Sequence, residues 1–443
     1  MWNLTRPVRS CTYLLALTFP SAWSATITDG TYHPTRTSDG LIVRSEFDTL
    51  PVNTWYRIAG SSFKVLEEEI VRSFNASRAT NYDWKKLNAG VTGSVVTAVN
   101  GWTAGIWDEK RQRIVLQYPG GHTNGAVNGI WTWDVLAARW VIMDIPSDPY
   151  DPPWSAAYRE SYGQGYYPRK DLPPEIAALH IYSDIYPDGK PATRHQYASD
   201  VHDTTRDAYH STRVSLWTFQ PSSKKYSANT LKYSSGESFP GSFGGAAVYD
   251  RHNDQIVGLI KKDPTSYYDW REVDIASGVT REIPPLISEN FSSRGGSMAL
   301  VPGTSHVLIM SGSEDSKCER YAVYDLRTRK HLRSSTAVNG CLASGGDNEL
   351  PALTYVPEWG KWLRRMTKLV SGEKCGWYIF DHEKNEQIKV EFNRTPSCAP
   401  FIGRKLVYSK LLGALILISE QDPTQDAVWM LRVGDEPPPR TVK

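Results

Sequence analysis

The sequence predicts an all-β fold, a kelch-type β-propeller of four-stranded antiparallel blades, and two observations carry this prediction. In residues 95–144, four short apolar runs are separated by turn residues, as in one antiparallel meander. This meander recurs, so that six repeats are visible. The turn after the first strand marks the phase at Asp108, Asp203, Asp250, Pro302, Pro357 and Ser409. The intervals are 95, 47, 52, 55 and 52 residues, and a period near 50 is typical of propeller blades.

The first interval is twice the others because it contains an insertion at about residues 147–193. This insertion is rich in Pro, Tyr, Gly and Asp. Long loops in compact domains are usually functional or disordered, and its aromatic content argues against disorder. We expect it to form a wall over the central face of one propeller domain that spans residues 25–443.

The two ends of this domain are predicted to meet in one blade. The last repeat, Lys405–Val433, shows only three clear strands, whereas Asn53–Ile58 reads as one isolated strand. A propeller must protect the edges of its first and last blades, so we expect the N-terminal strand to complete the C-terminal sheet. The sequence leaves open whether Ser62–Ala79 is a short helix or a wrapped loop.

Residues 1–24 have the pattern of a secretory signal peptide. Arg6 and Arg9 precede the apolar run Tyr13–Leu17, and Ala22–Ser24 provides a small-residue cleavage site. Neither this run nor any later one is long enough to span a bilayer. We therefore expect a mature protein that is secreted or periplasmic and monomeric.

The net charge and the aromatic content of the chain indicate which kinds of molecule it could bind. The net charge is +2 with no basic tract, so a nucleic-acid partner is not expected. The 16 Trp and 24 Tyr suit pleated strands and surfaces that face carbohydrate. No sequence motif calls for a cofactor.

The four cysteines after the signal segment follow the repeat. Cys318 and Cys341 lie 16 and 39 residues after Pro302, and Cys375 and Cys398 lie 18 and 41 residues after Pro357. Two successive blades thus carry the same pair at the same phase, which predicts disulfides Cys318–Cys341 and Cys375–Cys398. A four-cysteine metal site is the rival interpretation, but the spacing lacks a CxxC motif.

The second repeat contains most of the side chains that could take part in catalysis. We expect its first hairpin to turn near Thr205, with paired residue numbers that sum to about 410. This register places Tyr197 opposite Arg213 and His195 opposite Ser215, and directly paired residues share a face. In the preceding blade, the glycine-rich segment Pro119-Gly120-Gly121-His122-Thr123-Asn124 allows a close approach to a ligand. The alternative interpretations are that His122 is an exposed histidine of a turn, and that Tyr197 and Arg213 are a pair that only packs across the strands.

The motifs PGGHTNG and TRHQYASDVHD resemble those of the galactose-oxidase-like propellers of exported bacterial polysaccharide lyases, the ulvan lyases in particular. The match is clearest over residues 95–220. The resemblance implies seven blades and a catalytic set of His122, Tyr197 and Arg213. The second histidine of that family has no counterpart here. Either a histidine among His195, His202 and His210 substitutes for it, or Tyr197 and His122 share the acid–base work.

These residue types fit β-elimination across C4–C5 of a uronate. Arg213 would neutralise the carboxylate next to the departing proton, while Tyr197 and His122 would exchange protons with C5 and O4. The expected substrate is an anionic, sulfated or unsulfated, polysaccharide. Expected substrate-binding residues are His195, His210, Asn124, Arg194, Arg294 and Arg404, the three arginines because each precedes an innermost strand.

Two other classes remain as alternatives. The first is a propeller that binds carbohydrate or a partner protein without chemistry. The second is a copper radical oxidase, which needs a free cysteine next to a tyrosine. The positions of the four cysteines in the repeat assign all of them to disulfides, which leaves no free cysteine for the oxidase. No metal-ligand motif is present in the sequence.

Overall fold

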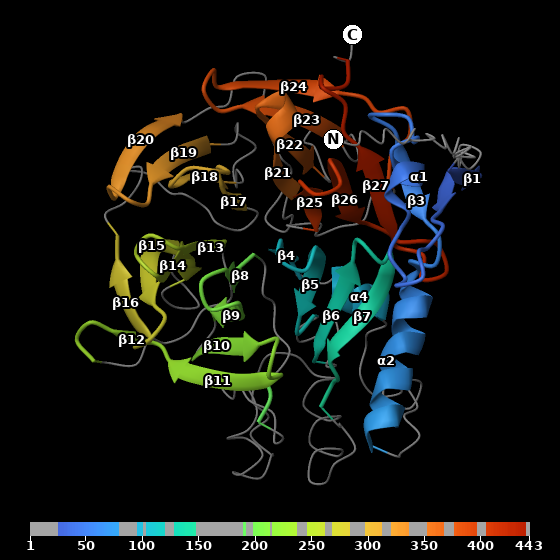
Figure 1. Ribbon diagram of the computed structural model, residues 1–443. Coiled ribbons are helices and arrows are strands. Elements are labelled where there is room, and N and C mark those ends of the chain that lie inside the picture. Colours follow the sequence, from blue (N-terminus) through green and yellow to red (C-terminus); the bar gives the residue numbers. More distant parts are fainter. Residues whose placement is uncertain are drawn as a thin grey trace, which may run out of the picture.

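The computed structural model describes residues 25–78, 95–100, 103–119, 128–147, 189–191, 198–212, 215–236, 246–261, 268–283, 297–311, 320–335, 352–366, 376–396 and 405–439. Six sheets stand around a common axis in these residues (Figure 1), which is the arrangement of a six-bladed β-propeller. The predicted all-β fold is therefore confirmed.

Each blade is an antiparallel meander whose first strand is innermost. Blade 1 contains β4 (Ile106–Asp108), β5 (Arg113–Gln117), β6 (Ile130–Asp134) and β7 (Arg139–Asp144). Blade 2 contains β8 (Asp200–Asp203), β9 (Ala208–Thr212), β10 (Ser215–Gln220) and β11 (Lys225–Thr230). Blade 3 contains β13 (Ala247–Asp250), β14 (Gln255–Lys261), β15 (Tyr268–Asp274) and β16 (Val279–Glu282), joined in parallel by β12 (Lys232–Tyr233).

Blades 4 to 6 repeat this order. Blade 4 contains β17 (Ser297–Leu300), β18 (His306–Ser311), β19 (Arg320–Asp325) and β20 (Lys330–Ser335). Blade 5 contains β21 (Ala352–Val356), the 3-10 turn η1 (Pro357–Trp359), β22 (Lys361–Met366), β23 (Gly376–Asp381) and β24 (Glu386–Val390). Blade 6 contains β25 (Leu406–Ser409), β26 (Ala414–Ile418) and β27 (Val428–Arg432).

The N-terminal segment completes blade 6, as the sequence predicts. Strand β3 (Trp55–Ile58) pairs antiparallel with β27, and the short strands β1 (Thr26–Thr28) and β2 (Thr31–His33) extend the sheet outward. A fourth strand from the other end of the chain therefore closes the ring.

In the described residues, three helices accompany the N-terminal part of the ring. They are α1 (Arg44–Phe47), α2 (Phe63–Arg78) and α4 (Val95–Asn100). Helix α2 lies against β7, the outer strand of blade 1 (Figure 1), and so covers an edge that would otherwise be open. Ser62–Ala79, left open between helix and loop, is thus largely helical. Helix α4 occupies the start of the run that the sequence assigned to the first meander.

The ring closes with six blades, not the seven that the family resemblance implied. Ile114 of blade 1 and Ile416 of blade 6 belong to one buried core. The Ser409 hydroxyl donates to Gln112 Oε1 across the same boundary at 2.6 Å. Blades 6 and 1 are therefore direct neighbours, and the six visible repeats account for the ring.

Seven of the hairpin turns at one end of the ring share one construction. An aspartate ends the strand, its carboxylate accepts backbone N–H groups of the turn, and the residue four positions later has positive φ. The pairs are Asp108/Gln112, Asp134/Ala138, Asp203/Asp207, Asp250/Asp254, Asp274/Gly278, Asp325/Arg329 and Asp381/Asn385. We call this end of the ring the turn end, and the opposite end the loop end.

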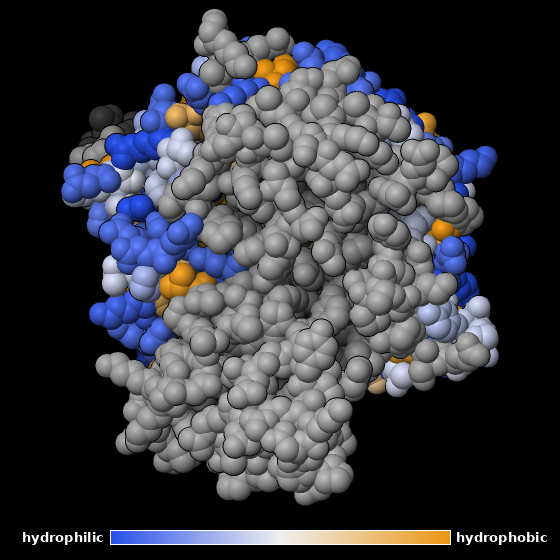
Figure 2. Space-filling view, turned by 180° about the vertical axis from the view of Figure 1, so that it is seen from behind, coloured by the Kyte–Doolittle hydropathy of each residue, from blue (hydrophilic) through white to orange (hydrophobic). Residues whose placement is uncertain are grey.

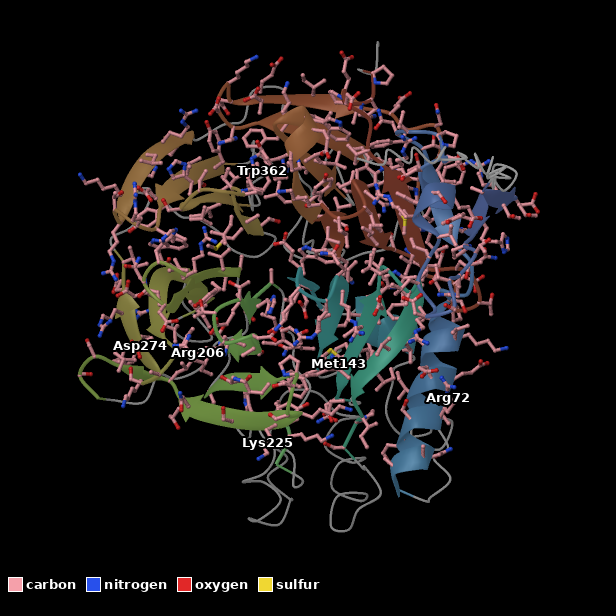
Figure 3. The ribbon with its side chains drawn as sticks, viewed as in Figure 1. Arg72, Met143, Arg206, Lys225, Asp274 and Trp362 are labelled. Atoms are coloured by element: carbon pink, nitrogen blue, oxygen red, sulfur yellow. The ribbon has the colours of Figure 1, made fainter. Side chains whose placement is uncertain are left out.

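Arginines at the turn end fasten blade to blade. Arg111 bonds Asp108 in its own turn at 2.8 Å and Asp207 of blade 2 at 2.6 Å. One blade further on, Arg206 (labelled in Figure 3) bonds Asp203 in its own turn at 2.8 Å and Asp254 of blade 3. The same device thus links blades 1, 2 and 3.

The apolar faces of the sheets are buried between blades, and the rim of the molecule is largely hydrophilic (Figure 2). In the part of the chain that the structure describes, no helix is long and apolar enough to cross a membrane.

Candidate functional site

The segments that carry His122, Tyr197 and Arg213 are attached to neighbouring strand ends. His122 follows β5, Tyr197 precedes β8, and Arg213 follows β9. These three residues lie outside the described residues, but β5 and β9 both end at the loop end and β8 begins there. Strands β8 and β9 are paired, and β4, the partner of β5, contacts β8 (Figure 1).

Strand alternation directs three polar side chains of this end into the boundary between blades 1 and 2. Val115 and Tyr209 pack in one buried cluster across this boundary, together with Met143 (Figure 3). Gln117 and Ser211 each lie two residues further along the same strands and therefore face the same boundary. Asp200 is paired with Ser211 and shares its face.

These three side chains are buried, which is unusual for a carboxylate and an amide. Gln117 is 1% exposed, Asp200 2% and Ser211 0%. Among the described residues, neither the amide nitrogen nor the amide oxygen of Gln117 has a hydrogen-bond partner. No pattern in the sequence indicates this burial, because Gln117 reads simply as the end of a strand.

Asn128 fixes the base of the inserted segment beside this boundary. Its amide nitrogen donates to Ser147 Oγ at 2.9 Å and to the Pro191 carbonyl at 2.8 Å, and its oxygen accepts the Ser147 N–H. Asn128 is 1% exposed and lies just before β6, the strand paired with β5. The two ends of the insertion are therefore held together at the loop end; residues 148–188 themselves lie outside the described residues.

The register of the first hairpin in blade 2 differs from the expected one by one residue. Asp200 pairs with Ser211 and Val201 with His210, so the paired numbers sum to 411. The loop contains four residues because Asp203 accepts the N–H groups of Thr205 and Arg206.

This shift changes the register on which the expected pairings were based. Ser215, expected opposite His195, begins the next strand, β10. The expected register was therefore wrong by one residue, and the pairing of Tyr197 with Arg213 stays a prediction about residues that lie outside the described part of the chain. What remains is that their segments leave adjacent strands.

His210 is the one proposed substrate-binding residue that the structure describes. It is fully buried and faces blade 3, since it pairs with Val201 in the core between blades 2 and 3. Its ring nitrogens lie 2.9 Å from Thr218 Oγ1 and 3.3 Å from Asp203 Oδ2. His210 is therefore placed to stabilise blade 2, and we do not include it in the proposed substrate site.

The other predicted residues lie outside the described part of the chain. They are the proposed substrate-binding residues His195, Asn124, Arg194, Arg294 and Arg404, and the cysteines Cys318, Cys341, Cys375 and Cys398. The strands that Arg194, Arg294 and Arg404 precede, β8, β17 and β25, are innermost strands, as expected. Among the described residues, no three His, Cys, Asp or Glu side chains form a group that could hold a metal ion.

Arg365 and Lys405 are buried cations at the loop end that the sequence did not predict. Arg365 stacks on Trp377 and donates to Ser419 Oγ and the Pro396 carbonyl, and burial lowers its pKa to about 9. Lys405 donates to the Val99 carbonyl at 2.6 Å, and burial lowers its pKa to about 7. For Arg365, the sequence signal was the pair Arg364-Arg365 within the largely apolar strand Lys361–Met366. Both cations tie neighbouring elements together, blade 5 to blade 6 and blade 6 to α4.

No protein-family model and no curated protein matches this chain. The crystal structure of TolB from Acinetobacter baumannii is similar over 65% of this chain and 54% of that chain, with a TM-score of 0.38 and 9% sequence identity. The chain thus spans about half the length of TolB, and a likeness at this level supports no inference about function.

Proposed function

We propose that this chain is an exported polysaccharide lyase that cleaves a uronic-acid-containing anionic polysaccharide, such as ulvan, by β-elimination. The observation that supports this proposal is the adjacency of the ends of β5, β8 and β9 at the loop end. These strand ends carry the segments with His122, Tyr197 and Arg213, whose motifs resemble those of the ulvan lyases. The buried Gln117, Asp200 and Ser211 add polar groups beneath the same segments.

In the proposed reaction, a base removes the proton at C5 of the uronate and the electron pair forms the C4–C5 double bond. The C4–O4 bond breaks, and an acid protonates the departing O4. The guanidinium of Arg213 pairs with the uronate carboxylate, because a bidentate fork stabilises the charge that develops there. Tyr197 and His122 act as base and acid. The products are a polymer end with a free hydroxyl and an unsaturated uronate end.

The test is to incubate the purified mature protein with a panel of uronate polysaccharides and follow the ultraviolet absorbance of the conjugated product. We expect product with at least one polymer. Tyr197→Phe should lower kcat by about 10²–10⁴-fold, the usual effect of losing an acid–base group, while the far-ultraviolet circular dichroism stays unchanged. Phe retains the ring, so packing should survive.

A Tyr197→Phe protein with near wild-type turnover would contradict this assignment of roles. Saturable polysaccharide binding without any unsaturated product would instead favour the alternative, a propeller that binds carbohydrate without chemistry. His122→Ala separates two roles of the histidine. A collapse of kcat indicates proton transfer, and a rise of KM that exceeds the fall of kcat indicates substrate positioning.

A further inference from the structure

Gln117 is a buried amide that the fold does not use. Its side chain is 1% exposed, and neither of its polar atoms has a hydrogen-bond partner in the part of the chain that the structure describes. Buried polar groups in native proteins are nearly always hydrogen-bonded, because burial without a partner is costly. The other buried glutamines among the described residues each make at least one side-chain hydrogen bond: Gln112 with Glu109 and Ser409, Gln255 with Glu272, and Gln387 with Arg364. An amide kept without partners therefore points to a ligand.

The position of Gln117 supports this interpretation. It is the last residue of β5 at the loop end, and the segment with His122 begins two residues later. Its side chain faces the boundary between blades 1 and 2, the boundary that Asp200 and Ser211 also face. The base of the inserted segment is fastened at Asn128, two residues before Ile130, the cross-strand partner of Gln117.

We propose that Gln117 forms the floor of a sugar-binding subsite between blades 1 and 2, with the carboxyl group of Asp200 beside it. A carboxamide offers two donors and one acceptor, which matches a pair of adjacent sugar hydroxyl groups. A second carboxyl group next to Asp200 is disfavoured by charge. The subsite therefore takes a hydroxyl-bearing part of the chain, away from the uronate carboxylate that Arg213 holds.

The identity of the polymer rests on the proposed function, whereas the existence of the subsite does not. The experiment therefore measures binding and turnover separately. A reduced ulvan tetrasaccharide is titrated into the Tyr197→Phe protein and into Tyr197→Phe combined with Gln117→Met, by isothermal calorimetry. Methionine keeps the length and flexibility of the side chain but has no amide. The matched control is Gln255→Met, which removes a buried glutamine at the turn end of blade 3.

We expect Gln117→Met to weaken binding at least tenfold and to leave the thermal midpoint equal or higher, because an amide without partners contributes nothing to folding. Gln255→Met should change the dissociation constant less than twofold but lower the midpoint, since it loses the bond to Glu272. Unchanged affinity in Gln117→Met, or a midpoint lower than that of Gln255→Met, would overturn the subsite.

The absence of saturable binding by the Tyr197→Phe protein would overturn it as well. Tight binding that depends on Gln117, together with a wild-type protein that makes no unsaturated product, would uphold the subsite and reject the lyase. The two proposals can therefore fail independently.

Discussion

Lys405 has no exposed surface, and its ammonium group donates to the Val99 carbonyl at the C-terminal end of helix α4. The last carbonyls of a helix have no partner within the helix and favour a cation. This hydrogen bond accounts for the buried lysine, so no catalytic role is needed to explain its position. Burial nevertheless disfavours the charged form and lowers the pKa to about 7.

This shift predicts a stability that depends on pH. The unfolded chain keeps Lys405 protonated up to about pH 10.4, whereas the folded chain releases the proton above pH 7. Between these values the unfolded state binds more protons, so the free energy of unfolding rises with pH by up to about 1.4 kcal/mol per unit. Below pH 7 both states are protonated and this contribution is constant.

Urea titrations of the wild type and of Lys405→Met at several pH values measure this effect. The difference in unfolding free energy, wild type minus variant, should grow between pH 7 and pH 10. Lys225→Met, which removes an exposed lysine of β11, serves as the control and should run parallel to the wild type. Parallel profiles for Lys405→Met would show that the lysine stays charged inside the ring.

Single residues also show where sequence reasoning reached its limit. Motifs could locate the chain segments of His122, Tyr197 and Arg213, because glycine spacing and residue type are visible in a sequence. The burial of Gln117 was not visible, since it depends on which blade packs against β5. The register of the first hairpin in blade 2 failed for a related reason: Asp203 holds a four-residue loop, and one extra residue changes every pairing.

At the scale of secondary-structure elements, the turn-end hairpins that carry an arginine stabilise their own turn and also link two neighbouring blades. Asp203 is buried, which alone raises its pKa, but hydrogen bonds from His210 and Arg206 outweigh this and lower the pKa well below its usual value. The pKa of Asp207 is likewise lowered, chiefly by its hydrogen bond with Arg111. Each arginine thus compensates a carboxylate in its own turn and one in the next blade.

We therefore expect Arg206→Met to lower the free energy of unfolding by about 2 kcal/mol, the usual range for hydrogen bonds to a charged group. Arg72→Met is the matched control, because Arg72 pairs with Glu69 on the surface of α2 and is 74% exposed. Exposed pairs contribute little, and the control should change stability by less than about 0.5 kcal/mol. Urea denaturation of both variants at pH 7 measures this, and equal losses would contradict a special role for the turn-end arginines.

The blade rhythm was predictable because the turns follow one another at a nearly constant spacing. The aspartate turn occurs at seven of them, whereas the first turns of blades 4 to 6, at Pro302, Pro357 and Ser409, keep the spacing without the aspartate. The meanders and the closure by β3 followed from that rhythm. Helix α4 did not, since its apolar run Val95–Asn100 reads equally well as a strand.

The proposed disulfides would stiffen two successive blades in the same way. Cys318–Cys341 and Cys375–Cys398 each close a loop across equivalent parts of blades 4 and 5, and each should stabilise the protein by about 3 kcal/mol in the chain-entropy model. Peptide mapping under non-reducing conditions should recover these two pairs. A Cys341–Cys375 cross-link, or free thiols in the exported protein, would contradict the assignment.

At the scale of the whole molecule, the sequence repeat predicted the number of blades correctly, whereas the family resemblance implied one blade too many. Six repeats gave six blades, and Ser409 and Gln112 join the last to the first. A closed ring places the loop ends of all blades around one axis. The insertion based at Asn128 therefore starts from blade 1, beside the strand ends that carry the proposed catalytic residues.

Ring closure depends on strand β3, which reaches blade 6 from the other end of the chain. Trp55 of β3 is fully buried, pairs with Leu431 of β27, and stacks on Trp377 of blade 5 with ring centroids 5.3 Å apart. It therefore connects the N-terminal segment to two blades at once. Since β3 is the only described strand that covers β27, loosening it should expose an edge of blade 6.

We expect Trp55→Ala to lower the free energy of unfolding by about 3–5 kcal/mol, as large aromatic deletions in a core do. Limited proteolysis should then release residues near 25–60 before the rest of the ring is cut, because the segment loses its anchor. Leu411→Ala, at a residue 60% exposed in the first hairpin of blade 6, should change stability by less than about 0.5 kcal/mol. If Trp55→Ala lost less than about 1 kcal/mol and kept its N-terminal segment, closure would depend on the hydrogen bonds of β3 with β27 and not on the packing of its tryptophan.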